Sequence, residues 1–222
     1  MSSQKSFLSL LQLVSPSLPV GAYSYSEGIE TLVQTGQIHN AVTLEQWLIH
    51  ELSYGAIRME AAILGRVYQA AVDLDSEQIT IWNQWLSALR ETAEIREQSW
   101  QMGWSLLRLL RELQPENRLL QCDPCNFATA FAVAAAGWQI DRSVATLGYL
   151  QSWAANLVNA GLRLVPLGQT QGQRILLNLQ PQLEQTSTMV LQLSDDQLEC
   201  CSWGASLASM QHETLYSRLF RS

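Results

Sequence analysis

Residues 8–30 read LSLLQLVSPSLPVGAYSYSEGIE, a stretch that begins as a short apolar helix and ends that helix abruptly. Apolar residues continue at helical spacing to Val14. Pro16 then ends the helix, because proline lacks an amide donor and restricts the backbone conformation of the residue before it. Pro19 and Gly21 set an irregular backbone for the apolar residues that follow. Two interpretations remain open, namely a buried connection between helices and a surface that docks against a partner.

The charge pattern favours the docking surface. Residues 1–40 carry only three charged side chains, those of Lys5, Glu27 and Glu30. Tyr23 and Tyr25 lie two residues apart, so an extended backbone would place both rings on one face. We therefore predict that this stretch supports a dimer or partner contact, with Tyr23 at the interface rather than in the core.

The composition indicates a protein that associates with others. A chain of 222 residues with 47% hydrophobic residues is long enough for one domain with a large core. Only 15% of its residues are charged, so the surface is either polar and neutral or partly covered by other chains, and a surface of low charge predicts association. The net charge of −7, without a lysine or arginine cluster, argues against nucleic-acid binding. No apolar run is long enough to span a membrane, so we expect a soluble, cytoplasmic protein.

Helical spacing recurs along the chain, and strand signals are nearly absent. A capping box at Thr43–Gln46 predicts a long helix to Val72 with a bend at Gly55. Asp75 and Asp141 predict the starts of two further helices. The small residues between 126 and 139 indicate a central helix that its neighbours approach closely. We predict a single all-α domain over residues 1–222, with eight to ten helices.

The residues that could carry chemistry are few. His39, His50 and His212 lie far in sequence from one another and from every cysteine, so a metal site within one chain is not expected, although a symmetric dimer could pair two histidines. The C-x-x-C motif of Cys122 and Cys125 could bind zinc or cycle as a thiol pair, but ordinary thiols are favoured because no second pair accompanies it. Nucleotide-binding and hydrolase motifs are missing. We expect a non-enzyme without a cofactor.

Arg163 is a lone guanidinium within the apolar segment AGLRLVPLGQ. Such a group needs a carboxylate or carbonyl partner. The partner could belong to another protein, although one within the chain, such as Glu94, is favoured.

Four segments in the same order resemble the UreF family of urease accessory proteins. They cover most of the chain and read LLQLVSPSLPVGAYSYSEGIE at 10–30, EIREQSWQMG at 94–103, LQSWAANLVNAGLRLVPLGQTQGQ at 150–173, and HETLYSRLFRS at 212–222. The resemblance implies a helical homodimer that joins UreD (also called UreH) and the GTPase UreG on apo-urease. In that role it would regulate GTP-dependent nickel delivery to the urease active site. The alternative is a helical ligand-binding or adaptor protein unrelated to urease.

We expect the partner contacts to come from three segments. They are residues 8–30, which we call the opening stretch, the segment after Pro166, and the C-terminal tail at 211–222. The tail should be mobile unless docked, and UreD should order it, with Tyr216 and Phe220 as anchors and Arg218 as a hydrogen-bond donor. The glutamine-rich helix start after Pro166 should contact UreG, unless it is only a solvated N-terminal turn. The expected partner-binding residues are Pro19, Gly21, Tyr23, Tyr25, Arg163, Pro166, Gly168, Gln169, Gln173, His212, Glu213, Tyr216, Arg218, Leu219, Phe220 and Arg221.

Overall fold

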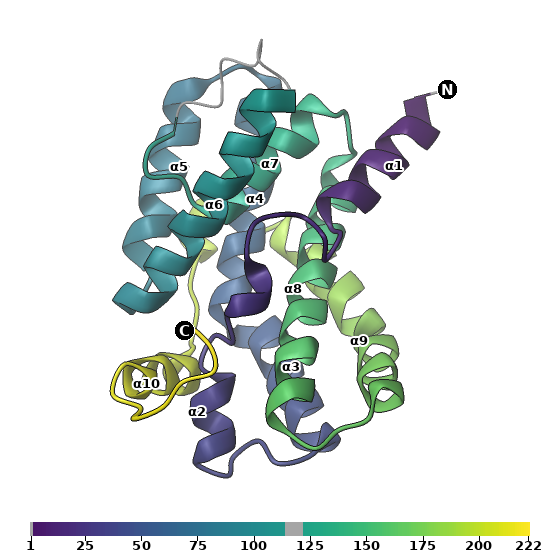
Figure 1. Cartoon of the computed structure of the whole chain (residues 1–222). Helices are drawn as coiled ribbons and strands as arrows, with labels where there is room; N and C mark the ends of the chain where they lie inside the picture. The colour runs from purple at the N-terminus through teal and green to yellow at the C-terminus, as the bar shows by residue number, and fades with distance from the viewer. Residues whose placement is uncertain (1, 114–121) are drawn as a thin grey trace.

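The computed structural model describes residues 2–113 and 122–222, and this part of the chain is all-helical (Figure 1). It contains ten α-helices and two short 3-10 helices but no strand, which confirms the all-α prediction. In chain order the elements are α1 (Ser2–Leu13), η1 (Ala22–Ser24), α2 (Ile29–Gln34), α3 (Ala41–Tyr54), α4 (Ala56–Val72), α5 (Ser76–Leu89), α6 (Ala93–Leu113), α7 (Phe127–Gly137), α8 (Arg142–Leu164), α9 (Gln169–Val190), η2 (Asp195–Gln197) and α10 (Trp203–His212).

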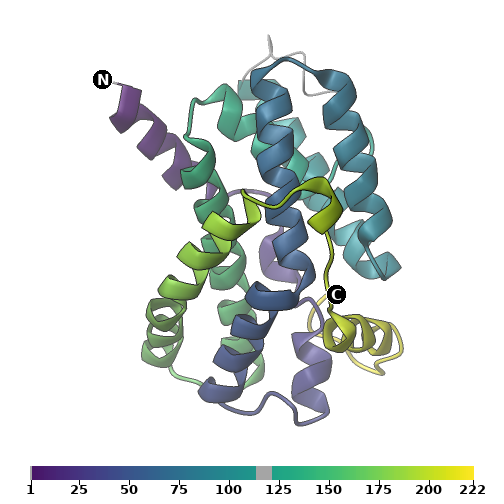
Figure 2. The same ribbon diagram turned by 180° about the vertical axis from the view of Figure 1, so that it is seen from behind.

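Helix α4 is the centre of the core. It packs against α5 and α7 at one end of the molecule and against α3, α8 and α9 at the other, and Figure 2 shows it running through the middle. Its apolar side chains are buried along its length, including Met59, Ile63 and Val67. Helix α7, the small-residue helix, is buried almost throughout, which confirms its predicted central position. Small side chains allow α4 and α6 to pack closely against it.

Two helix boundaries differ in detail from the sequence prediction. The N-cap of α3 is Asn40, whose side-chain oxygen accepts a hydrogen bond from the Thr43 amide at 2.9 Å. Thr43 therefore occupies the third helical position rather than the cap. The extended backbone of Gly55 divides the predicted long helix into α3 and α4, so the expected bend is a break. Asp75 and Asp141 cap α5 and α8 as predicted.

The first and last helices differ in how they contact the rest of the molecule. Helix α1 projects from the body, as Figures 1 and 2 show. Its outer face exposes Phe7, Leu8 and Leu11. Helix α10 packs on α2, and the residues after it return to the opening stretch (Figure 1).

A buried carboxylate lies where α3 meets the segment before α10. Glu51 is 7% exposed, and one of its oxygens accepts a hydrogen bond from the Ser202 hydroxyl at 3.3 Å. Burial raises the pKa of Glu51 to about 7; the Ser202 hydrogen bond opposes this rise, and the charges of Glu27 and Glu91 add to it. The ionised form of Glu51 therefore destabilises the fold at neutral pH.

We predict that Glu51→Gln stabilises the protein in a pH-dependent way. Below the unfolded pKa of 4.5, Glu51 is protonated in both states, so the variant should gain little. Stability of the natural protein should fall as pH rises from 4.5 through about 7, because unfolding then releases a proton. Urea unfolding at about pH 8.5 should show the variant more stable by roughly 2–3 kcal/mol.

Glu184→Gln is the control for this experiment, because Glu184 is exposed on α9 and loses the same charge. An equal gain for both variants, or a Glu51→Gln gain that does not change between acid and alkaline pH, would contradict the prediction.

Candidate functional site

The end of the chain pairs with the opening stretch. The Ser222 carbonyl oxygen accepts hydrogen bonds from the Ser26 amide at 2.8 Å and the Ser26 hydroxyl at 2.7 Å. The Arg221 amide donates to the Ser24 carbonyl at 2.9 Å. We call the residues that hold tail residues 218–222 the tail-docking site; they are Ser24, Ser26, Glu30, Glu94, Gln98 and Arg163.

Glu30 is the buried centre of this site. One carboxylate oxygen accepts from the Leu219 amide at 2.7 Å, and the other accepts from the Phe220 amide at 3.0 Å. The side chain belongs to α2 and is almost completely shielded from solvent. Since a buried carboxylate needs donors, these two backbone amides stabilise Glu30 and hold the tail in one conformation.

His212 links Glu30 to a second carboxylate. The ring is fully buried; its Nδ1 lies 2.7 Å from Glu94 and its Nε2 lies 3.3 Å from Glu30. Arg218 binds the other oxygen of Glu94 at 2.7 Å. Thus two of the predicted partner-binding residues, His212 and Arg218, bind carboxylates of their own chain.

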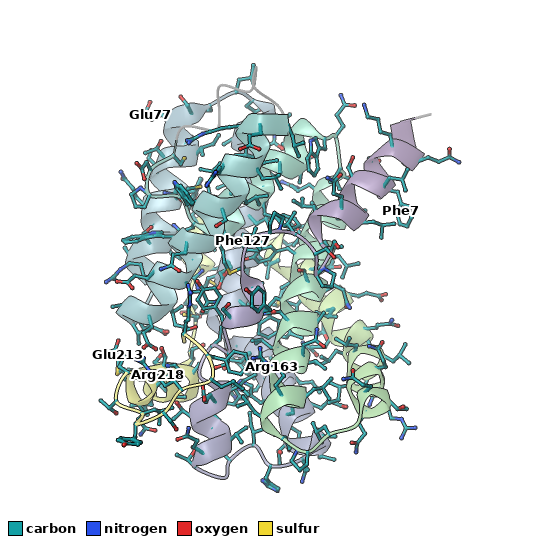
Figure 3. The ribbon with its side chains drawn as sticks, in the orientation of Figure 1. Phe7, Glu77, Phe127, Arg163, Glu213 and Arg218 are labelled. Atoms are coloured by element: carbon teal, nitrogen blue, oxygen red, sulfur yellow. The ribbon has the colours of Figure 1, made fainter. Side chains whose placement is uncertain are left out.

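Arg163 has a different partner from the one expected. Its Nη1 donates to the Tyr23 carbonyl at 2.9 Å, and its guanidinium carbon lies 4.4 Å from the centre of the Phe220 ring. The partner lies within the chain, as favoured, but it is a backbone carbonyl rather than Glu94, whose carboxylate binds His212 and Arg218. Figure 3 shows Arg163 on α8, where it faces the end of the chain. Arg163 therefore joins the opening stretch to the tail.

Tyr23 and Tyr25 do not share a face. The 3-10 helix η1 turns the backbone between them, after Gly21 with a φ of 76°. Tyr23 is 74% exposed, whereas Tyr25 is 4% exposed and its hydroxyl donates to Gln101 at 2.7 Å. The expectation of a common face is wrong because it assumed extended backbone, and Tyr25 belongs to the core. Pro19 is exposed in the same connection.

The tail has an inner and an outer side. The Phe220 side chain and Ser222 are buried, whereas Tyr216 is fully exposed and Leu219 about half exposed. Glu213 is also exposed. Tyr216 therefore lies free for a partner, but Phe220 already packs within the chain. The expectation that the tail of the isolated protein is mobile unless docked stays a prediction; the structure places it docked on its own chain.

The predicted UreG-facing segment lies apart from the tail-docking site. Pro166, Gly168, Gln169 and Gln173 are exposed at the start of α9. The Gly168 amide donates to the Gln171 side chain at 2.9 Å, which is a local N-terminal cap. Within the described part of the chain, no hydrogen bond joins this segment to the tail-docking site.

A buried polar cluster beneath the tail-docking site was not predicted. Arg90 forms an ion pair with Glu60, whose other oxygen accepts from the Tyr149 hydroxyl at 2.6 Å. Glu27 accepts from Gln98 and from the Trp153 indole, each at 2.9 Å. The sequence did indicate that Glu60 is unusual, since it is a charged residue within an apolar helical segment. Its partners are distant in sequence, so local spacing could not predict them.

This cluster is connected to the tail and to a cavity. The Ser222 hydroxyl donates to Gln98, which in turn donates to Glu27. Burial raises the pKa of Glu27, and the neighbouring charge of Glu60 adds to the rise. A cavity of about 160 Å³ between the opening stretch, α6 and α8 has Glu27, Glu60 and Arg90 in its wall. The position of the tail is thus coupled by hydrogen bonds to the wall of this cavity.

The described residues show neither a metal-binding cluster nor a membrane-spanning helix. Residues 2–113 and 122–222 hold no group of three or more His, Cys, Asp or Glu side chains arranged to bind a metal ion. None of the helices described is both long and apolar enough to cross a membrane. The expectations of no metal site and no cofactor stay predictions.

Comparison with known proteins now identifies the family. The family model named UreF matches residues 38–180. The chain belongs to the UreF family. It is 59% identical over 219 residues to the urease accessory protein UreF of Nostoc sp., covering 97% of this chain and 96% of the relative. It is also 57% identical over 222 residues to the urease accessory protein UreF of Microcystis aeruginosa. This alignment covers 100% of each chain. More distantly, it is 43% identical over 223 residues to the protein of that name in Janthinobacterium sp., covering 98% of this chain and 99% of the relative. The alternative of a protein unrelated to this family is therefore wrong.

We predict that Glu30→Gln loosens the tail of this UreF chain. The variant loses the charge that strengthens the hydrogen bonds from Leu219 and Phe220, each worth roughly 1.5–3 kcal/mol. Hydrogen exchange followed by mass spectrometry should show the 219–221 amides exchanging at least about tenfold faster, with the core helices unchanged. Glu97→Gln, which removes an exposed charge on α6, is the control. Unchanged exchange in the tail of Glu30→Gln would show that Glu30 does not hold it.

Proposed function

We propose that this UreF chain is a urease accessory protein that works by holding other proteins together and carries out no bond chemistry itself. In this proposal a soluble, cytoplasmic homodimer joins UreD (UreH) and the GTPase UreG on apo-urease and regulates GTP-dependent nickel delivery. The observation that carries the proposal is similarity over the whole chain to relatives that bear the name urease accessory protein UreF.

The exposed apolar surface supports a protein-binding role. Trp203, Leu207 and Met210 lie at helical spacing on the outer face of α10 and are each at least half exposed. Tyr216 and Leu219 extend this exposed apolar surface into the tail. Large exposed apolar side chains grouped in one region are typical of protein interfaces, where aromatic residues contribute most of the binding energy.

Partner binding at the tail should be tested with substitutions that leave the fold intact, because part of the tail is buried. Removing residues 211–222 would delete His212, which is fully buried between Glu30 and Glu94. Such a truncation would therefore destabilise α10 and α2 as well as remove a binding surface. Single substitutions of exposed rings separate these effects.

We predict that Tyr216→Ala and Tyr23→Ala keep the melting temperature of the protein, because both rings are largely exposed. Tyr216→Ala should weaken UreD binding by about tenfold or more, as expected for an aromatic anchor. Tyr23→Ala should weaken either self-association or UreD binding. Calorimetric titration with purified UreD, and sedimentation at several protein concentrations, measure these effects.

The matched control is Tyr54→Ala, which removes another exposed ring, on α3. Wild-type UreD affinity and wild-type self-association in both test variants would refute the assignment of these two tyrosines to interfaces. A fall in melting temperature that does not depend on protein concentration would instead place the ring in the core.

We further predict that the double variant Gln169→Ala with Gln173→Ala weakens UreG recruitment and urease activation but leaves UreD binding intact. These amides are exposed and can hydrogen-bond to a partner without burying a charge. The control is Gln180→Ala with Gln185→Ala, which changes exposed glutamines further along the same helix. Loss of UreD and UreG binding together would point to misfolding, and normal recruitment of both would assign the amides to solvent.

A further inference from the structure

The C-x-x-C motif lies in the connection that leads into α7. Cys122 and Cys125 flank Asp123 and Pro124, and α7 begins at Phe127. Both thiols are free, and each perturbs the pKa of the other. The Cys125 thiol also donates to the Asn126 carbonyl at 3.4 Å. Cys125 is only 2% exposed, whereas Cys122 is partly exposed. A reagent in solution can therefore reach the first cysteine but not the second.

The environment makes the two thiols chemically unequal. The hydrogen bond with Cys125 lowers the pKa of Cys122, although partial burial opposes this. The same hydrogen bond and burial raise the pKa of Cys125 well above its ordinary value. Since the thiolate is the nucleophile in thiol–disulfide exchange, the accessible cysteine is also the one prepared to react.

Hydrogen bonds from α5 hold this connection in place. Asn83 donates to the Pro124 carbonyl at 2.8 Å and accepts from the Asn126 amide at 2.9 Å. The Asn126 side chain donates to the Ser87 hydroxyl at 2.7 Å. On the other side, Gly103 of α6 leaves no room for a Cβ against the Cys125 carbonyl. The connection is therefore held at its α7 end, on the side of Cys125.

A hollow in the surface adjoins the accessible thiol. Its volume is about 320 Å³, and its wall includes Cys122, Trp100 and Gln84. The other lining residues are Thr80, Asn83, Ser87, Asp123 and Pro124, so the wall combines apolar surface with hydrogen-bonding groups and carries one acidic side chain. Such a surface offers hydrogen bonds and an aromatic ring to the peptide groups of a small thiol compound.

We propose that Cys122 and Cys125 form a redox-active dithiol that exchanges with a small peptide disulfide of the glutathione class. The Cys122 thiolate attacks one sulfur of that disulfide, whose S–S bond breaks; one glutathione thiolate leaves and takes up a proton. Cys125 then loses its proton and attacks the Cys122 sulfur of the mixed disulfide, and the second glutathione leaves as a thiol. The two protein thiols are oxidised to one disulfide, and the peptide disulfide is reduced to two thiols.

The test follows the redox state of the full chain in buffers with graded ratios of oxidised to reduced glutathione. After an acid quench, free thiols are alkylated with N-ethylmaleimide and mapped by mass spectrometry. We expect a Cys122–Cys125 disulfide that appears and disappears with the glutathione ratio. Under reducing conditions, alkylation of Cys122 should be at least about tenfold faster than that of Cys125.

Variants separate the two steps. Cys125→Ser should accumulate a mixed disulfide of glutathione on Cys122, which the natural protein resolves. Cys122→Ser should leave Cys125 reduced at every ratio, because its sulfur is buried. The control is Cys200→Ser with Cys201→Ser, which removes the other two cysteines and should not change the result.

The unaltered protein decides the outcome even if a variant fails to fold. Free Cys122 and Cys125 in a buffer that contains only oxidised glutathione would overturn the proposal. A mixed disulfide on Cys122 that persists in the natural protein would also overturn it, as would equal alkylation rates for the two thiols.

Discussion

The buried carboxylate of Glu30 is the interaction on which the arrangement of the chain ends depends. A carboxylate removed from water without donors costs several kcal/mol, so α2 could not keep this side chain buried on its own. The amides of Leu219 and Phe220 supply the missing donors, and the His212 ring lies 3.3 Å from the same carboxylate. The tail in turn depends on Glu30, because its backbone amides need an acceptor once Phe220 is buried. Docking of the tail and burial of Glu30 are therefore one event.

This arrangement gives the tail two separate roles. Its inner residues complete the hydrogen bonds of the body, and Arg163 covers the Phe220 ring. Its outer residues, with the exposed face of α10, form apolar surface that the chain itself does not cover. In a protein with only 15% charged residues, such surface favours lasting contact with other chains over solvation. A partner that binds the outer side meets a segment already shaped by the inner side, which reduces the entropy lost on binding.

Local sequence signals were sufficient for the helices but not for the contacts between distant segments. The caps at Asp75 and Asp141, and the small residues of α7, act within one helix or between close neighbours, so spacing alone predicted them. Resemblance and apolar character singled out the opening stretch and the tail as candidate partner-binding segments, an assignment that stays a prediction. Their mutual pairing could not be predicted, because Ser26 and Ser222 lie 196 residues apart and nothing in either segment specifies the other. The partner of Arg163 was missed for a related reason: a backbone carbonyl, such as that of Tyr23, leaves no mark in a sequence.

The great separation between these segments has a consequence for synthesis on the ribosome. Non-local pairing is slow to form, because the entropy of closing a long loop is lost before any contact compensates for it. Helices α2 to α9 contain their own core contacts and can associate while the chain is still growing. Glu30, in contrast, must wait for Leu219 and Phe220, which emerge 189 and 190 residues later. A nascent chain that has not yet reached these residues therefore has a largely formed helical core but no docked tail, so it lacks the ordered outer surface that the docked tail presents.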